Sequence, residues 1–220
     1  MTIREFRPSP DGPEQALEAA VSASAWNLIR SPRAMTWAGA HPVIGAGLPD
    51  LVLVAWRGVR PPRQPLESAD AEVFAYLRGV SRIRPTTLAA RLRLPEHRVE
   101  ERLDRLRGLR AVKRRGTAYS IAPRWRDILA EVITIEAKVS KWRRAIQQAR
   151  RNRLFAHRSY VALPEHLVPR VSTDAGFLAS GVGLLAVDDG GAMLLVREAT
   201  VGMPRIWVYY YRLAVLAATA

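Results

Sequence analysis

The sequence predicts an α/β protein whose mixed central sheet is flanked by helices and interrupted by an inserted helical module. Helical and strand-like patterns alternate in residues 1–65 and resume in residues 125–220, whereas residues 66–124 are mainly helical in pattern. Between them, residues 60–65 (RPPRQP) can neither continue a sheet nor start a packed helix, which favours a short stiff linker. We therefore expect a discontinuous core, 1–65 with 125–220, and an insertion over 66–124.

The first part of the core predicts one helix and two strands. Residues 12–30 carry apolar side chains at helical spacing, and Pro13 suits a first helical turn. Residues 34–44 predict a strand broken by turn residues. Residues 50–56 (DLVLVAW) form an apolar run typical of a buried strand.

The insertion predicts three helices followed by a hairpin. The helices are expected over 69–77, over 85–92 and from residue 96 onward, and two short strands are expected within 111–121. This succession resembles a winged helix-turn-helix. The resemblance implies that the third helix enters the major groove of DNA and that the wing touches the DNA backbone or minor groove.

In the second part of the core, strand-like and helical patterns alternate again. The pattern of the C-terminal residues 206–220 fits either a strand or a helix. A basic amphipathic helix is expected over 141–157. Strands are expected over 131–139, 159–163, 183–188 and 192–197.

Charge points to a polyanionic partner. The 220 residues carry a net charge of +14 with a pI near 11.2. The surplus lies in residues 66–125, which sum to +7, and in 138–158, which sum to +8. Such clustering favours nucleic acid over the alternative of a generally basic surface that only promotes solubility.

Composition also excludes several classes of site. The chain has no cysteine, so disulfides, iron–sulfur clusters, cysteine zinc sites and thiol nucleophiles are excluded. No apolar stretch is long enough for a signal peptide or a membrane span, and we expect a cytoplasmic protein without a membrane partner. The four histidines show no ligand spacing and are expected in surface or loop positions.

Charged residues at strand positions suggest a catalytic site. Asp50 follows Pro49 at the start of one apolar strand, and Glu136 lies inside another, with Lys138 two residues on and on the same face. Burying such charges costs several kcal/mol unless they are paired or bind an ion. The pattern Pro49-Asp50 with Glu136-Ala137-Lys138 resembles the PD-(D/E)xK nuclease superfamily, which implies a restriction-endonuclease-like core.

The resemblance implies a metal-dependent DNA endonuclease that hydrolyses phosphodiester bonds. Asp50 and Glu136 would bind Mg²⁺ or Mn²⁺ together with the backbone carbonyl of Ala137, and Lys138 would orient or activate the attacking water. Either Glu14 or Glu18 would add a carboxylate from the first helix. These two glutamates lie one turn apart on the same helix face, and the choice between them stays open.

The sequence departs from this family at two points. Asp50 and Glu136 lie 86 residues apart, which we interpret as an insertion of the winged helix between two adjacent strands. Some relatives also carry a Gln-x-x-x-Tyr motif on the following helix. Here Gln148 matches its glutamine and is a candidate catalytic residue, but Asn152 stands where the tyrosine would fall.

The basic residues expected to contact duplex DNA lie on three segments. They are Arg98, Arg102 and Arg105 on the third helix of the insertion, Lys113, Arg114 and Arg115 on the wing, and Lys141, Arg143, Arg144, Arg150 and Arg151 on the basic helix. Many members of the family dimerise to cut both strands, which makes a homodimer possible.

Other interpretations remain open. A Glu-x-Lys pattern on a strand is also typical of a solvated face or an in-strand salt bridge. The chain could be a DNA-binding transcriptional regulator with an inactive nuclease-like core, because the winged helix alone would suffice for binding. Winged helices also bind other proteins, so a scaffolding protein is a third possibility.

Overall fold

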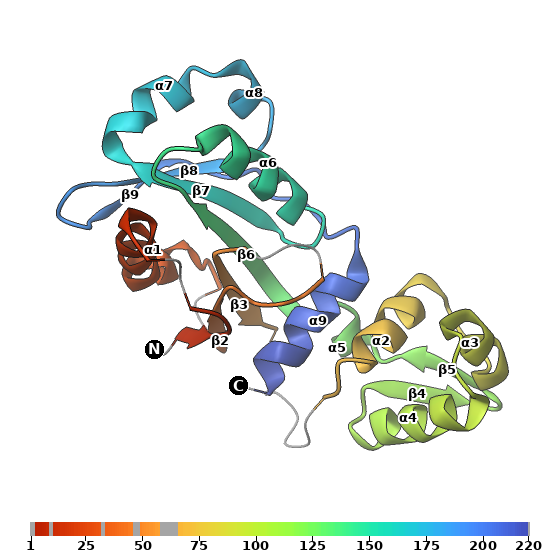
Figure 1. The fold of residues 1–220 in the computed structure, drawn as a ribbon. Coiled ribbons are helices and arrows are strands. Elements are labelled where there is room, and N and C mark those ends of the chain that lie inside the picture. The colour runs from red at the N-terminus through yellow and green to blue at the C-terminus, as the bar shows by residue number, and fades with distance from the viewer. Residues whose placement is uncertain (1–2, 9–10, 32–33, 46–48, 58–65, 220) are drawn as a thin grey trace. The chain divides into compact units, whose positions relative to one another are not determined.

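The structure is a computed structural model that describes residues 3–8, 11–31, 34–45, 49–57 and 66–219 (Figure 1). The chain forms two compact units. One comprises Met1–Ala55 and Glu131–Ile206, and the other comprises Trp56–Ala130 and Trp207–Ala220. The expected linker at 60–65 lies outside the described residues.

The first unit is built on a seven-stranded sheet in the order β1-β2-β3-β6-β7-β8-β9. The strands are β1 (Ile3–Glu5), β2 (Thr36–Ala40), β3 (Leu51–Trp56), β6 (Leu129–Ala137), β7 (Arg158–Pro164), β8 (Gly183–Val187) and β9 (Met193–Arg197). β1/β2, β6/β7 and β7/β8 pair in parallel, whereas β2/β3 and β8/β9 pair antiparallel. The predicted α/β class with a mixed sheet is confirmed, and β1 is a strand that the sequence analysis missed.

Helices cover both faces of this sheet. Tyr160 and Ala162 of β7 pack in one core with α1 (Pro13–Ser24), whereas Val161 and Leu163 pack in another with α6 (Trp142–Asn152). Because successive strand residues point to opposite faces, α1 and α6 cover opposite sides of the sheet (Figure 1). The shorter helices of this unit are η1 (Ala25–Leu28), η2 (Glu165–Leu167), α7 (Val168–Ser172) and α8 (Ala175–Leu178).

Both main helices of the first unit end earlier than predicted. α1 gives way after Ser24 to the 3₁₀ turn η1, whereas an α-helix was expected to residue 30. α6 ends at Asn152 and not at residue 157. The chain turns there because Phe155 is fully buried and the His157 N–H donates to the carbonyl of Val132 at 2.9 Å, which joins this segment to β6.

The second unit contains three successive helices and a two-stranded hairpin, in the order that the sequence predicts. These elements are α2 (Asp70–Gly79), α3 (Pro85–Leu92), α4 (Glu96–Gly108), β4 (Val112–Arg115) and β5 (Ala118–Ile121), followed by α5 (Pro123–Arg126). β4 and β5 pair antiparallel around Gly116, whose φ of 61° lies in the left-handed region that glycine adopts without strain.

The ambiguous C-terminal segment is a helix, α9 (Trp207–Ala218). Its Tyr210 hydroxyl donates to the carbonyl of Leu129 at 3.0 Å, and its Tyr211 ring lies 5.3 Å from the ring of Phe74 in α2. A buried tyrosine needs such a partner for its hydroxyl. These contacts group α9 with the helices of the second unit, whereas the sequence analysis assigned residues 125–220 to the core.

A buried carboxylate ties α4 to the start of α2. Asp70 is fully buried and accepts a hydrogen bond of 2.6 Å from Nη2 of Arg105 and one of 2.7 Å from the N–H of Glu67. Nε of Arg102 lies 3.6 Å from the same carboxylate. Arg102 and Arg105 were expected to form one basic stripe toward DNA with Arg98. In the structure these two side chains turn toward α2 and neutralise Asp70.

We predict that Asp70→Ala lowers the free energy of unfolding by about 2–4 kcal/mol, because it leaves two partly buried guanidinium groups without their shared counter-charge. Urea denaturation followed by circular dichroism measures this change. The matched control is Glu100→Ala, which removes an exposed carboxylate from α4. Equal stability of the two variants would contradict the structural role given to Asp70.

Candidate active site

The two parts of the predicted motif meet where β3 and β6 lie side by side in the sheet. Asp50 directly precedes β3 and follows the buried Pro49, and Glu136 and Ala137 are the last two residues of β6. The N–H of Ala137 donates to Oδ2 of Asp50 at 2.8 Å. The structure thus brings Asp50 and the Glu136–Lys138 segment together across a long stretch of intervening chain, as the motif required.

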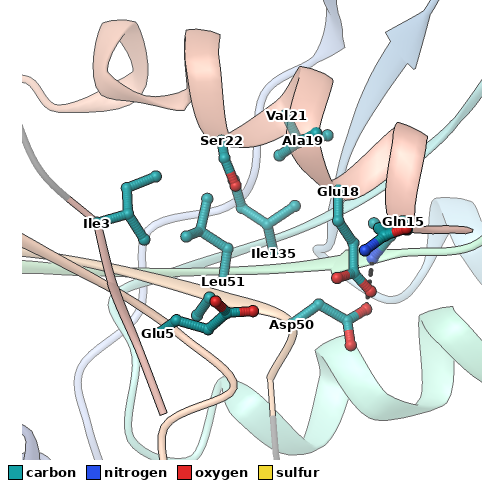
Figure 2. A pocket seen from close by; sticks show the side chains of 12 residues that line it. Ile3, Glu5, Gln15, Glu18, Ala19, Val21, Ser22, Asp50, Leu51 and Ile135 are labelled. Carbon is teal, nitrogen blue, oxygen red and sulfur yellow. Dashed lines mark hydrogen bonds between the residues drawn. The ribbon is translucent and has the colours of Figure 1, made fainter. Parts of the chain in front are cut away.

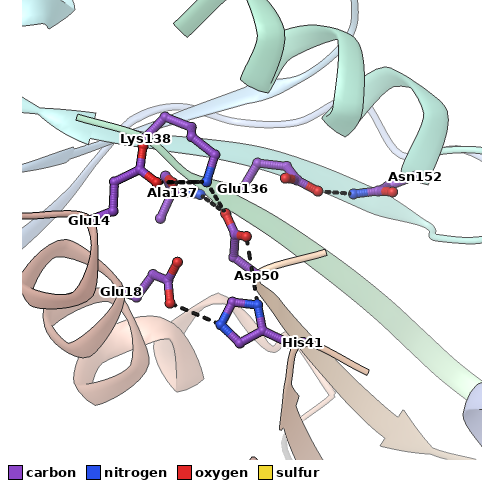
Figure 3. Close-up of polar contacts among 8 residues, drawn as sticks. All are labelled: Glu14, Glu18, His41, Asp50, Glu136, Ala137, Lys138 and Asn152. Atoms are coloured by element: carbon purple, nitrogen blue, oxygen red, sulfur yellow. Dashed lines mark hydrogen bonds and ion pairs between the residues drawn. The ribbon is translucent and has the colours of Figure 1, made fainter. Parts of the chain in front are cut away.

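Lys138 lies just beyond the end of β6 and points back to Asp50. Its backbone N–H still donates to Ala162 of β7 at 3.1 Å, so the chain keeps its direction there. Its ammonium donates to Oδ2 of Asp50 at 3.1 Å and to the carbonyl of Ala137 at 2.9 Å, and lies 3.5 Å from Oε2 of Glu14 (Figure 3). Burial alone would lower the pKa of Lys138, but the Asp50 and Glu14 carboxylates outweigh burial and raise it.

Glu136 is the most deeply buried acid of the cluster, with 1% of its surface exposed. Nδ2 of Asn152, at the end of α6, donates to its Oε1 at 2.6 Å. Burial, followed by repulsion from Asp50, raises the pKa of Glu136 to about 8. Asn152, which stands where the family's tyrosine would fall, is therefore the residue of α6 that orients this carboxyl group.

His41 joins the cluster from the loop after β2, and the sequence analysis missed it. It lies in a loop as expected, but its side chain is buried. Nε2 lies 3.0 Å from Oε2 of Glu18 and Nδ1 lies 3.8 Å from Oδ1 of Asp50. The antiparallel register of β2 and β3 places His41 opposite Asp50, and its N–H donates to the Asp50 carbonyl at 3.0 Å. No spacing in the sequence signals that register.

Both candidate glutamates of α1 reach the cluster, by different routes. Glu14 contacts Lys138, whereas Glu18 contacts His41 (Figure 3). Because they lie one turn apart on one face of the helix, α1 presents both to the sheet. The sequence left open which of the two glutamates belongs to the site. In the structure both contact residues of the cluster, each through a different partner.

A hollow of about 210 Å³ adjoins the cluster on the α1 side of the sheet (Figure 2). Glu18, Asp50 and Ala137 line it together with Gln15 and apolar side chains of α1 and the strands. The Asp50 side chain is 11% exposed and that of Lys138 15%. The acidic cluster is therefore reachable by small solutes.

The residues present fit a hard divalent cation. Glu14, Glu18 and Asp50 bring carboxylates to the α1 side of the sheet near the ammonium of Lys138, and Glu136 adds a carboxyl group that Asn152 of α6 holds. In the part of the chain that the structure describes, Oε2 of Glu136 and Oε1 of Glu18 are buried without a hydrogen-bond partner. Buried carboxyl oxygens without a partner are donors of the kind that Mg²⁺ or Mn²⁺ prefers.

The Lys138 ammonium and a bound metal would need the same oxygens. Across the described residues, no group of three or more His, Asp or Glu side chains is arranged to hold a metal ion. The ammonium of Lys138 instead lies on oxygens of Asp50, Ala137 and Glu14, which are those that the resemblance assigns to the metal. A bound cation would therefore compete with Lys138 for these atoms.

Gln148 lies one turn before Asn152 on the same face of α6. Its Oε1 is buried and, among the described residues, has no hydrogen-bond partner. The structure therefore leaves one acceptor of Gln148 available on the helix face that reaches Glu136 through Asn152.

The predicted DNA-contacting residues differ in their surroundings. Five of these residues are exposed at or on α6: Lys141, which directly precedes the helix, and Arg143, Arg144, Arg150 and Arg151 on it. The three wing residues on β4 are exposed as well: Lys113, Arg114 and Arg115. On α4, Arg98 is exposed and lies 3.5 Å from Glu101, whereas Arg102 and Arg105 bind Asp70. The open basic surface therefore lies on α6 and the hairpin more than on α4.

Comparisons with protein-family models, with curated proteins and with solved structures found no match. Within the described ranges, no helix is both long and apolar enough to cross a bilayer.

We predict a distinctive pH dependence of stability in the metal-free protein. Glu136 holds a proton in the folded state up to a pKa of about 8, whereas an unfolded glutamate loses it near pH ~4.3. The stabilisation that wild type has relative to Glu136→Gln should therefore fall as pH rises between these values, by at most about 1.4 kcal/mol per pH unit.

Urea denaturation in excess chelator at several pH values measures this difference. The control is Glu165→Gln, which alters an exposed glutamate of η2 and should follow wild type at every pH. Parallel pH profiles for wild type and Glu136→Gln would show that Glu136 ionises normally.

Proposed function

We propose that this protein is a divalent-metal-dependent DNA endonuclease of the PD-(D/E)xK type, with a restriction-endonuclease-like core. One observation carries the proposal. The ammonium of Lys138 is held by oxygens of Asp50, Ala137 and Glu14, and the N–H of Ala137 donates to the same Asp50 carboxylate. A simple in-strand salt bridge would not require an acid from another strand and a second one from a helix.

Asp50, Glu136, the carbonyl of Ala137 and one or both of Glu14 and Glu18 would hold the metal. When bound, Mg²⁺ or Mn²⁺ would supply Lewis acidity and charge neutralisation at the phosphate. Asp50 is held for this task by the N–H of Ala137, and Glu136 is held by Asn152. Their orientation is thus set by the backbone of β6 and by α6.

Lys138 provides the mobile cation of the site. Its flexible side chain can leave the Asp50 carboxylate and donate to a water or to a phosphate oxygen. A raised pKa keeps this ammonium charged, so it acts as a donor that orients the attacking water and neutralises phosphate charge. His41 holds Glu18 and faces Asp50, which positions the acidic side of the cluster.

Residues 66–124 are proposed to be a winged helix that grips duplex DNA. The order of α2, α3, α4 and the β4–β5 hairpin supports this assignment. The exposed Lys113, Arg114 and Arg115 suit phosphate contacts, which add affinity without sequence choice. Because Arg102 and Arg105 neutralise Asp70, Arg98 is the member of the α4 stripe left for DNA.

We predict that the purified protein nicks supercoiled plasmid with Mg²⁺ or Mn²⁺ and not with a chelator. Asp50→Asn keeps an acceptor for the Ala137 N–H but loses the charge, and Lys138→Met loses the ammonium. Each should lower the cleavage rate by more than about 100-fold, the scale of removing one charge-stabilising group. Glu165→Gln is the control and should cleave as wild type does.

Gel analysis of plasmid topology measures these rates. Equal nicking by all four proteins would reveal a contaminating nuclease and remove the assignment. Tight binding of one DNA sequence without any cleavage would instead favour the transcriptional regulator with an inactive core.

Metal affinity gives a separate prediction. Because the Lys138 ammonium lies on the oxygens proposed for the metal, Lys138→Met should bind Mn²⁺ about tenfold more tightly than wild type, although it is inactive. Electron paramagnetic resonance of free Mn²⁺ measures this affinity, with Arg170→Met as a control that removes an exposed charge from α7. Weaker binding by Lys138→Met than by wild type would contradict the competition between lysine and metal.

A further inference from the structure

A second basic feature lies at the C-terminal end of α6, within the first unit. A hollow of about 420 Å³ is lined by Arg150, Arg153 and Arg205, together with Ser180, Gly202 and apolar side chains. No aspartate or glutamate is among its described lining residues. Three guanidinium groups around one space repel one another, and an anion would offset that repulsion.

Arg153 lies in the wall of this hollow and is anchored there by a backbone carbonyl. Its Nη1 donates to the carbonyl of Ser180. Gly181 allows this approach, because its φ is +68° and a Cβ there would lie 2.0 Å from the same nitrogen. The guanidinium is therefore placed before any ligand arrives, which lowers the entropy cost of binding.

Arg205 is brought to the hollow by a loop from the end of β9. The N–H of Arg205 donates to the carbonyl of Leu154 at 2.7 Å, and that of Gly202 donates to the carbonyl of His157 at 2.8 Å. These bonds fasten the loop to the segment that follows α6. Arg205 is thereby fixed beside a helix that precedes it by about fifty residues in the sequence.

Helix stabilisation explains only part of this cluster. Arg150 and Arg151 lie in the last turn of α6, where cations interact favourably with the helix dipole. Arg205 is not on the helix. Arg153 uses one N–H to bind the carbonyl of Ser180. In the described part of the chain, neither Arg150 nor Arg205 forms an ion pair, and both are exposed. Their charges are available to a ligand.

A neighbouring hollow of about 350 Å³ shares Arg150 and Leu154 with the first and is also lined by Gln147 and Arg151. Two basic hollows with a common wall suit a ligand that carries anionic groups in succession. Guanidinium groups bind phosphate oxygens in pairs of parallel hydrogen bonds. The repeated anion of a nucleic-acid strand meets both requirements.

We infer that these two hollows bind successive phosphates of one DNA strand, with Arg150 between them and Arg205 on the outer side. The inference rests on the proposed function, because it takes DNA as the substrate. It adds Arg153 and Arg205 to the binding surface, neither of which the sequence pattern singled out. It also assigns the exposed side of α6 to strand positioning, while its inner side supports Glu136 through Asn152.

The test measures the affinity of the full chain for a fluorescein-labelled duplex oligonucleotide by anisotropy, in chelator, over a range of salt concentrations. Each lost phosphate contact should reduce the slope of log K against log salt by about 0.9. We expect Arg205→Ala to lose about one such unit and Arg150→Ala/Arg205→Ala about two, with affinity several-fold weaker at each step. Arg205→Lys should keep most of the slope but bind more weakly, because it loses the paired donors.

Arg170→Ala is the control, since Arg170 is an exposed arginine of α7 in the same unit. It should leave the slope unchanged, and thermal melts should show all variants folded. If Arg170→Ala and Arg205→Ala lose the same amount of salt slope, the hollows contribute no more than any exposed basic surface, which would overturn the inference. A second outcome would also overturn the inference: Arg205→Ala binds DNA as wild type does, and inorganic phosphate alone raises the melting temperature of wild type. The hollow would then be a site for a free anion.

Plasmid cleavage separates this inference from the proposed function. If wild type cleaves plasmid and Arg205→Ala retains the full salt slope, the two hollows do not bind the DNA strand, and the proposed nuclease function is unaffected. If the slope falls as expected but wild type never cleaves, the two hollows bind the DNA strand, and the proposed nuclease function is wrong.

Discussion

The candidate site depends on one hydrogen bond between neighbouring strands, from the N–H of Ala137 to the carboxylate of Asp50. It joins two residues that are 87 positions apart. It places Oδ2 of Asp50 where the Lys138 ammonium also reaches it. If β3 and β6 were not adjacent, Asp50, Glu136 and Lys138 would be three unrelated charges. Their adjacency requires the intervening chain to leave the sheet and return beside its point of departure. In the structure this chain packs with α9 as the second compact unit.

The charge balance of this cluster differs from that of an ordinary structural salt bridge. Lys138 compensates Asp50 and Glu14, but Glu136 and Glu18 each keep a buried oxygen without a partner in the described part of the chain. Because burial and the nearby Asp50 raise the pKa of Glu136 to about 8, this carboxyl group retains its proton at neutral pH. A protein selected for stability alone would gain from apolar residues at such positions. Perturbed ionisation in a small reachable cluster is typical of active sites.

The sequence could predict most of the sheet and the main helices, and it could point to residues of the candidate site, because each leaves a local pattern. Asp50 and Glu136 were recognisable as charges within apolar strands. His41 was not, because its burial follows from the register of β2 against β3. Arg102 and Arg105 looked like an exposed stripe because Asp70, which neutralises them, lies on another helix. α9 was ambiguous because its tyrosines find their partners about 80 residues earlier in the chain. Contacts between distant segments decide these cases, and local periodicity carries no record of them.

The most direct test of the account is a crystal structure of the protein grown with Mn²⁺, examined by anomalous scattering. The account predicts one anomalous peak within about 2.5 Å of the Asp50 and Glu136 carboxylates, with the Lys138 ammonium displaced from Asp50. A cluster without such a peak at saturating Mn²⁺, with Lys138 still on Asp50 and Ala137, would contradict it.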